Sequence, residues 1–206
     1  MTFDYENQQD WPQVVGQSQS PINLILAESQ PERWTGLNTA LRGTAAKATD
    51  KTLNVTGGGI TEVGGRTAIF DQLHFHQPAE HVINGKRAVM EAHFVHHFSD
   101  GQTVIIAVPL AIGEVNPVMA AVLVMPETPI EFPISLRGLL PTATDWYHYM
   151  GSRTTPPVRE GASWYVAARP QTISADQLAA YVERFPLMTN RDIQPLNDRP
   201  VLLLHL

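Results

Sequence analysis

Residues 72–97, QLHFHQPAEHVINGKRAVMEAHFVHH, contain six of the eight histidines of this 206-residue chain. Side chains alternate between the two faces of a β-strand, so His74 and His76 lie on the same face of one strand. His93 belongs to a second strand further along. Between the two runs, residues 83–86 (Ile-Asn-Gly-Lys) are typical of a hairpin turn, because Asn-Gly readily adopts the positive φ that such turns require. Antiparallel pairing of the two strands would bring the three imidazoles together.

Three converging imidazoles predict a catalytic zinc centre formed by His74, His76 and His93. Such a centre leaves a fourth position open, whereas structural zinc sites usually have four protein ligands, commonly cysteine. This chain contains no cysteine. Gln72 and Glu91 each precede a histidine by two residues on the same strand face. Their side chains are therefore expected to accept the second N–H of the ligating rings. A bare His-x-His pair occurs on many solvated strands, so the prediction depends on the whole set.

The order Gln-x-His-x-His, Glu-His and Glu-x-His-x-x-His resembles the core signature of the α-class carbonic anhydrases, bacterial type. Four further segments resemble that family: QSQSPINL (17–24), GEVNP (113–117), YMGSRTTPPVREGASWYV (149–166) and NDRPV (197–201). The resemblance implies one domain over residues 1–206 with a loop-rich N-terminal arm at 1–20. It also implies a mostly β fold, with a large central, mainly antiparallel twisted sheet and a few short peripheral helices.

The activity that the resemblance implies is the reversible hydration of carbon dioxide to bicarbonate and a proton by zinc-bound hydroxide. Glu80 would not bind the metal but would accept the hydroxyl proton of Thr154, and this would orient the attacking oxygen. Thr155 would contact bicarbonate. The backbone carbonyl of Asn197 would accept a hydrogen bond from His76. The residues expected to line the apolar half of the site are Val95, Ile105 and Trp164.

Two positions differ from the usual pattern of that family. Lys51 falls where fast members carry a proton-shuttling histidine, and a lysine ordinarily titrates at about 10.4, too high to relay protons well near neutral pH. Slow or buffer-dependent proton transfer is therefore expected. Arg153 falls where leucine is usual, at the mouth of the carbon dioxide pocket. A permanently charged arginine there could narrow the pocket, attract anions or turn into solvent.

Local patterns predict several elements. Residues 116–123 (NPVMAAVL) and 174–185 (SADQLAAYVERF) carry capping residues before good helix formers, which indicates two short helices. The apolar run 103–113 is typical of a buried central strand, although Pro109 suggests a bulge or interruption there. The glycine groups in residues 57–65 suggest successive hairpins.

The formal net charge of −6, the pI of about 5.7 and the lack of a basic run argue against nucleic acid or an anionic membrane as partner. No apolar run approaches the roughly 20 residues of a membrane span. The polar N-terminus lacks the pattern of a signal peptide. These features predict a cytoplasmic protein, or an extracellular one if Met1 replaces a cleaved leader. The expected partner is a small molecule, carbon dioxide or bicarbonate, and the chain would be a monomer or a homodimer.

Two other functions remain open. The chain could be a binding protein of the same fold with weakened catalysis, an interpretation to which Lys51 and Arg153 lend some support. It could also be a zinc esterase, because a zinc-bound hydroxide can attack activated esters. No serine nucleophile elbow, His-Glu-x-x-His motif or dinucleotide-binding glycine motif indicates another chemistry.

Overall fold

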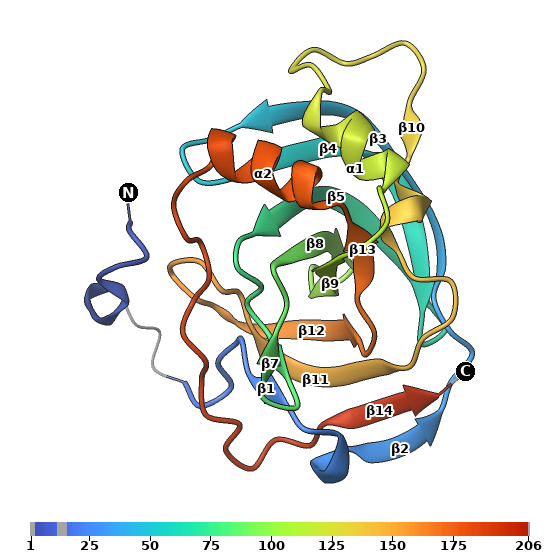
Figure 1. Cartoon of the computed structure of the whole chain (residues 1–206). Coiled ribbons are helices and arrows are strands. Elements are labelled where there is room, and N and C mark those ends of the chain that lie inside the picture. Colours follow the sequence, from blue (N-terminus) through green and yellow to red (C-terminus); the bar gives the residue numbers. More distant parts are fainter. Residues whose placement is uncertain (1–2, 12–15, 206) are drawn as a thin grey trace.

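The computed structural model describes residues 3–11 and 16–205. Strands are the main regular structure among these residues, and they form an 11-stranded sheet and a small 3-stranded sheet (Figure 1). The strands of the large sheet are β2 (Gln30–Arg33), β3 (Asn38–Ala48), β4 (Leu53–Val63), β5 (Arg66–His76), β8 (Met90–His97), β9 (Thr103–Ile112), β10 (Ile134–Ser135), β11 (Trp146–Ser152), β12 (Glu160–Ala167), β13 (Gln171–Ile173) and β14 (Leu202–His205). Those of the small sheet are β1 (Asn23–Leu24), β6 (Val82–Ile83) and β7 (Lys86–Arg87).

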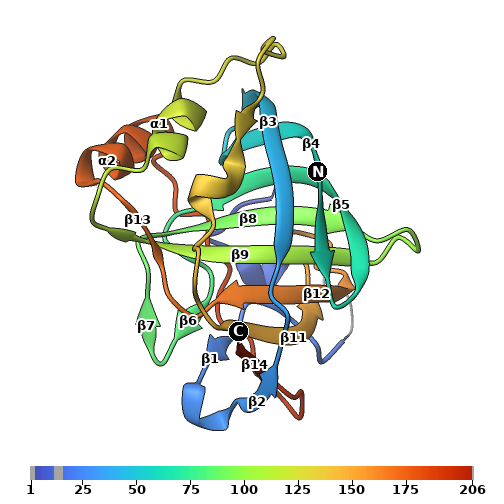
Figure 2. The ribbon, with the colours of Figure 1, turned by 90° about the vertical axis from the view of Figure 1, so that its right-hand side faces the viewer.

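The strand order of the large sheet is β10-β3-β4-β5-β8-β9-β12-β11-β14-β2, with β13 paired beside β9. Among the described strands of this sheet, the parallel pairs are β9 with β12, β9 with β13, and β14 with β2. The sheet is strongly twisted, since β3 runs vertically in Figure 2 while β8 and β9 run across the view. The prediction of a large, twisted, mainly antiparallel sheet is confirmed.

Two short α-helices, α1 (Pro117–Leu123) and α2 (Ala175–Arg184), pack against the sheet. The chain also forms 3₁₀ turns at η1 (Gln8–Asp10), η2 (Leu26–Glu28) and η3 (Leu136–Leu139). Asn116 caps α1 by accepting from two backbone N–H groups of its first turn. Ser174 caps α2 in a reciprocal capping box with Gln177. Both predicted helices are confirmed. Within residues 3–11 and 16–205, no helix is long and apolar enough to cross a membrane.

Alternation along the strands separates two hydrophobic clusters on opposite faces of the sheet. Phe75, Phe94 and Ile106 point into the larger cluster, which α1 and α2 cover. Ile105 and Ala107, the neighbours of Ile106 along β9, point to the other face. His74, His76 and His93 alternate with Phe75 and Phe94 in the same way. The histidines therefore share the face of the smaller cluster.

The expected interruption at Pro109 is wrong. β9 continues from Thr103 to Ile112, and Pro109 pairs in register with Glu91 of β8 without a bulge. On the other side of β9, β12 pairs only as far as Ala107 and β13 begins opposite Leu110. Pro109 lies in the gap between these two partners, so its missing N–H removes no rung from that side of the sheet.

The expected series of hairpins at the glycines is also only partly correct. Gly64 and Gly65 form the turn between β4 and β5, with φ of 56° and 72°. Gly57 and Gly59, in contrast, lie inside the continuous strand β4. A Cβ atom at either position would collide with a backbone carbonyl of β3, that of Arg42 or Ala40. These glycines permit close backbone approach at a bulge and do not reverse the chain.

The predicted Asn84-Gly85 turn is present, with φ of 49° and 75°. It joins β6 to β7, whereas β5 and β8 are connected by the whole segment that contains this small hairpin. Of the expected N-terminal arm, residues 1–2 and 12–15 lie outside the described residues. In the described part, Phe3, Tyr5 and Trp11 form an edge-to-face aromatic cluster.

Candidate metal centre

His74 and His93 are direct cross-strand partners in the antiparallel pairing of β5 and β8. His76 lies two residues beyond His74 on the same face. The ring centroids are 5.1 Å apart for His74 and His76, 5.3 Å for His74 and His93, and 4.6 Å for His76 and His93. One nitrogen from each ring lies within 4.8 Å of the others. The structure brings the three predicted ligands together.

In two of the three histidines, one ring nitrogen donates a hydrogen bond that fixes the orientation of the ring. His93 donates from Nε2 to Oε1 of Glu91 at 2.8 Å, as expected from their spacing. His76 donates from Nδ1 to the backbone carbonyl of Thr189 at 2.6 Å. Nε2 of His76, the other nitrogen of that ring, is buried and lacks a hydrogen-bond partner among the described residues. This pattern leaves nitrogen lone pairs available at the point where the rings converge.

The prediction that Asn197 supplies the acceptor for His76 is wrong. Asn197 is exposed, in a positive-φ conformation at 54°, and its side-chain amide binds the carbonyl of Gln17. Thr189 instead clamps the end of β5: its N–H donates to the carbonyl of Gln77 at 2.8 Å, and its hydroxyl accepts from the N–H of Gln77 at 3.1 Å. This local pairing places the Thr189 carbonyl against His76.

The expected hydrogen bond between Gln72 and His74 is not formed, because Nδ1 of His74 has no partner within the described part of the chain. Gln72 lies on the expected strand and lines the same cavity as His74. It borders a register shift in the pairing of β5 with both β4 and β8. Such bulges re-aim side chains, which is a physical reason for the missing hydrogen bond.

Glu91 has a second role that its spacing did not predict. Oε1 of this fully buried carboxylate accepts from Nδ1 of His81 at 2.6 Å as well as from His93, and Oε2 accepts from the backbone N–H of His81 at 2.8 Å. Nε2 of His81 continues the network to the hydroxyl of Tyr149 at 2.7 Å, and that hydroxyl donates to Ser20. His81 is therefore a buried structural histidine that holds Glu91.

The electrostatics of the cluster favour neutral imidazoles. Burial lowers the pKa of His74, His76 and His93, that of His76 to about 4, and mutual repulsion among the rings adds to the effect. Burial alone would raise the pKa of Glu91, but the imidazoles of His81 and His93 hold it well below its usual range. A neutral ring backed by a carboxylate is the form that binds a metal ion.

Glu80 is a second fully buried carboxylate beside the cluster. Its Oε1 accepts from the backbone N–H of Arg191 at 2.9 Å, and its Oε2 lies 4.0 Å from Nδ1 of His93. Burial raises the pKa of Glu80 to about 7, although nearby His93, the Thr154 hydroxyl and the Arg191 N–H act against this rise. Oε2 has no hydrogen-bond partner among the described residues and is free to accept from buried Thr154.

The three predicted apolar residues form one row across neighbouring strands. Val95 of β8 pairs with Ile105 of β9, which pairs with Trp164 of β12. All three are nearly or fully buried on the histidine face, and the indole of Trp164 packs edge-on against His93 with centroids 5.1 Å apart. One side of the histidine cluster is therefore apolar.

A cavity of about 310 Å³, here called the histidine cavity, lies beside the cluster at His74 and His76. Its lining includes His74, His76, Thr155, Tyr5, Asn54 and Lys51. Nζ of Lys51 lies 2.5 Å from Oδ2 of Asp50 and 4.9 Å from the ring centre of Phe3. The predicted lysine is thus at the cavity wall, paired with its neighbouring carboxylate.

Arg153 is exposed and lines a separate, adjoining cavity, described below. Its positive charge contributes to the lowered pKa of His74, so the guanidinium lies within electrostatic range of the cluster. The remaining histidines of β8 lie apart from the cluster. His96 is buried on the opposite face, where it binds Thr61, and His97 faces Asp71 at 3.5 Å.

The sequence profile of the family described as eukaryotic-type carbonic anhydrase matches residues 6–123 and 114–204. A carbonic anhydrase of Pectobacterium carotovorum is 32% identical over 201 residues, which cover 91% of this chain and 80% of that protein. One of Neisseria gonorrhoeae is 33% identical, with 91% and 78% covered. The α-carbonic anhydrase of Thermovibrio ammonificans, solved with the inhibitor sulfanilamide, superposes with a TM-score of 0.85 at 34% identity, covering 91% and 88%.

Proposed function

The chain belongs to the eukaryotic-type carbonic anhydrase family and is an enzyme of that class. We propose that it binds zinc through His74, His76 and His93 and that the zinc centre hydrates carbon dioxide reversibly. The observation that carries the proposal is the convergence of three neutral imidazoles, two of them fixed from behind by Glu91 and the Thr189 carbonyl.

The residues present fit a zinc ion. The buried Nε2 of His76 lacks a hydrogen-bond partner among the described residues, and buried polar atoms are seldom left without one. Three histidine nitrogens without a fourth protein ligand match the donor set of a catalytic zinc site. When bound, zinc supplies Lewis acidity that makes water a nucleophile near neutral pH, an effect for which carbonic anhydrases are the usual example.

Thr154 and Glu80 would orient the attacking oxygen. Oε2 of Glu80 is buried and can accept the hydroxyl proton of Thr154, since carboxylates accept hydrogen bonds and hydroxyls both donate and accept. With its proton committed to Glu80, Oγ1 of Thr154 can act only as an acceptor toward the nucleophile. This arrangement selects the direction from which the nucleophile reaches carbon dioxide.

The row of Val95, Ile105 and Trp164 would hold carbon dioxide. These buried apolar side chains exclude water beside His93 and offer no hydrogen bond, which suits a small apolar substrate better than bicarbonate. Thr155, which lines the histidine cavity on the polar side, would contact the product bicarbonate. Substrate and product therefore meet surfaces of opposite polarity.

Proton export would depend on buffer. Apart from the proposed ligands His74 and His76, the lining of the histidine cavity contains no histidine among the described residues. Lys51 carries its ammonium against Asp50 and would relay protons poorly. We also propose that the chain forms one domain and acts as a monomer or a homodimer.

The two alternative functions, binding protein and zinc esterase, predict different experimental outcomes. A binding protein of the same fold would take up zinc without turnover, and a zinc esterase would favour activated esters over carbon dioxide. The deciding experiment is stopped-flow carbon dioxide hydration by zinc-loaded protein at rising buffer concentration, with ester hydrolysis measured in parallel and sulfanilamide added as inhibitor. Hydration that rises with buffer and is blocked by sulfanilamide supports the proposal. Stoichiometric zinc without hydration would overturn it.

A further inference from the structure

A second cavity, of about 460 Å³, adjoins the histidine cavity and has a different chemistry. We call it the arginine cavity, because Arg153 and Arg159 both line it. Thr155 lines both cavities and therefore lies at the boundary between them. The arginine cavity is thus next to the proposed reaction site, on the loop that also carries Thr154.

The two arginines are held together by the backbone. The N–H of Arg153 donates to the carbonyl of Arg159 at 2.9 Å, which closes the loop between β11 and β12. Both side chains are exposed, and neither guanidinium has an ion pair or hydrogen bond within residues 3–11 and 16–205. The fork of an unpaired guanidinium matches the two oxygens of a carboxylate-like anion.

The other charged groups of the cavity do not neutralise the positive charge of the two arginines. Glu160 also lines it, but its Oε1 already accepts from the Ser18 N–H at 2.7 Å and the Gln19 amide at 2.8 Å. His97 also lines the cavity, and its ring faces the carboxylate of Asp71. The remaining polar lining, which includes Gln102 and Thr103, is neutral. With two arginines and one carboxylate in its lining, the cavity has a net positive charge that attracts anions. The whole chain, in contrast, has a formal net charge of −6.

We propose that the arginine cavity is an anion subsite that takes bicarbonate, a planar oxyanion, between solvent and the reaction site. This inference rests on the proposed function, since bicarbonate is the product of hydration and the substrate of dehydration. Arg153 and Arg159 bind the anion, and Thr155 receives it at the boundary with the histidine cavity. Raising the local bicarbonate concentration in this way favours dehydration and strengthens product inhibition of hydration.

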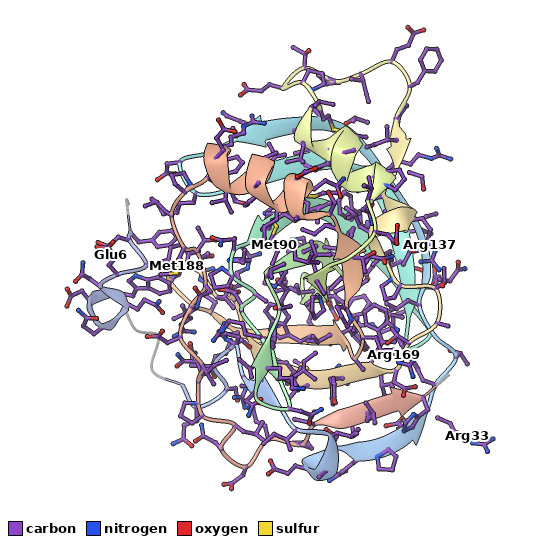
Figure 3. The ribbon with its side chains drawn as sticks, viewed as in Figure 1. Glu6, Arg33, Met90, Arg137, Arg169 and Met188 are labelled. Atoms are coloured by element: carbon purple, nitrogen blue, oxygen red, sulfur yellow. The ribbon has the colours of Figure 1, made fainter. Side chains whose placement is uncertain are left out.

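The test compares Arg159→Leu with Arg169→Leu in full-length, zinc-loaded protein. Arg159 immediately precedes β12, whereas exposed Arg169 lies beyond the opposite end of that strand (Figure 3). Eight residues of strand separate the two by roughly 26 Å at about 3.3 Å per residue. The two substitutions change the formal charge equally, so only the local effect differs.

For Arg159→Leu, we expect the KM for bicarbonate in dehydration to rise about 2- to 5-fold, the scale of an exposed ion pair. Arg169→Leu should leave this KM unchanged. The difference should shrink at about 1 M salt, because the Debye length falls to about 3 Å. Equal effects of the two variants, or no effect of either, would overturn the subsite.

A binding measurement separates this inference from the proposed function. Arginine Nε–H signals of the zinc-loaded protein are followed by NMR during a bicarbonate titration at constant ionic strength. Saturable shifts at Arg153 and Arg159, with Arg169 unmoved, support the subsite even if the protein proves to be inactive. Shifts that do not saturate, or that are equal at Arg169, would contradict it. An active wild-type protein without these shifts would refute the subsite while leaving the proposed function intact.

Discussion

Oε1 of Glu91 accepts hydrogen bonds from both His93 at 2.8 Å and His81 at 2.6 Å. The same carboxylate oxygen therefore fixes a proposed metal ligand and a structural histidine. Because Glu91 is fully buried, its charge depends on these two imidazoles for compensation. The orientation of His93 thus depends on the core network that reaches Tyr149 and Ser20.

Replacement of Glu91 by Gln should weaken zinc binding about 10- to 100-fold, the usual effect of removing a carboxylate behind a ligating histidine. The amide carries no charge, and it cannot accept from both imidazoles as strongly. Zinc affinity measured by chelator competition tests this, with exposed Glu114→Gln as the matched control. Unchanged affinity in the Glu91 variant would show that the carboxylate does not support the metal site.

Thr154→Ala should lower carbon dioxide turnover by about 100-fold, the scale of losing one orienting hydrogen bond in an active site. Zinc content should stay stoichiometric, since Thr154 is not a proposed ligand. Thr154→Ser keeps the hydroxyl and should restore most of the turnover. The measurement is stopped-flow hydration together with metal analysis. Loss of zinc in the Ala variant, or full activity without the hydroxyl, would each rule out the orienting role.

Thr189→Ala should weaken zinc binding more than Asn197→Ala. The first substitution removes the hydroxyl that accepts from the Gln77 N–H, a hydrogen bond worth about 1 kcal/mol, and so loosens the carbonyl behind His76. The second removes only an exposed amide that binds Gln17. Chelator competition on both variants gives the comparison. A larger loss of zinc affinity in Asn197→Ala than in Thr189→Ala would contradict the role of Thr189 behind His76.

His96 should make the protein less stable in mild acid. Burial lowers its pKa in the folded state to about 4, from an ordinary value of 6.5, so the unfolded chain binds more protons between these values. Stability is therefore lost as pH falls from about 6.5 toward 4, by up to about 3 kcal/mol. The zinc-site histidines act in the same direction. The test therefore compares the free energy of unfolding, measured by urea denaturation across this pH range, for metal-free wild type and metal-free His96→Gln. The free energy of unfolding of the His96→Gln variant should depend less on pH.

Equal pH dependence of the two proteins would show that His96 contributes nothing to acid sensitivity. The geometry argues otherwise. Nδ1 of His96 donates to the carbonyl of Phe94 and Nε2 pairs with the hydroxyl of Thr61, both at 3.0 Å. These bonds satisfy a neutral ring in a site without solvent, whereas a second proton would add an uncompensated buried charge.

Local patterns in the sequence determined the elements of the site. The period of two along residues 72–76 and 91–95 places histidines on one face and phenylalanines on the other, and the sheet follows that alternation. Capping residues Asn116 and Ser174 determined where the two helices begin. Such patterns act over a few residues, so they can be recognised without knowledge of distant contacts.

Only the tertiary structure decided what surrounds those elements. The Thr189 carbonyl and the Arg191 N–H bind His76 and Glu80 from more than a hundred residues away, and backbone groups carry no side-chain signature in a sequence. Pro109 is tolerated because two separate strands flank it on one side of β9. Arg153 and Arg159 line one cavity because a backbone hydrogen bond closes their loop. Each depends on how distant segments pack, which alternation along one strand does not encode.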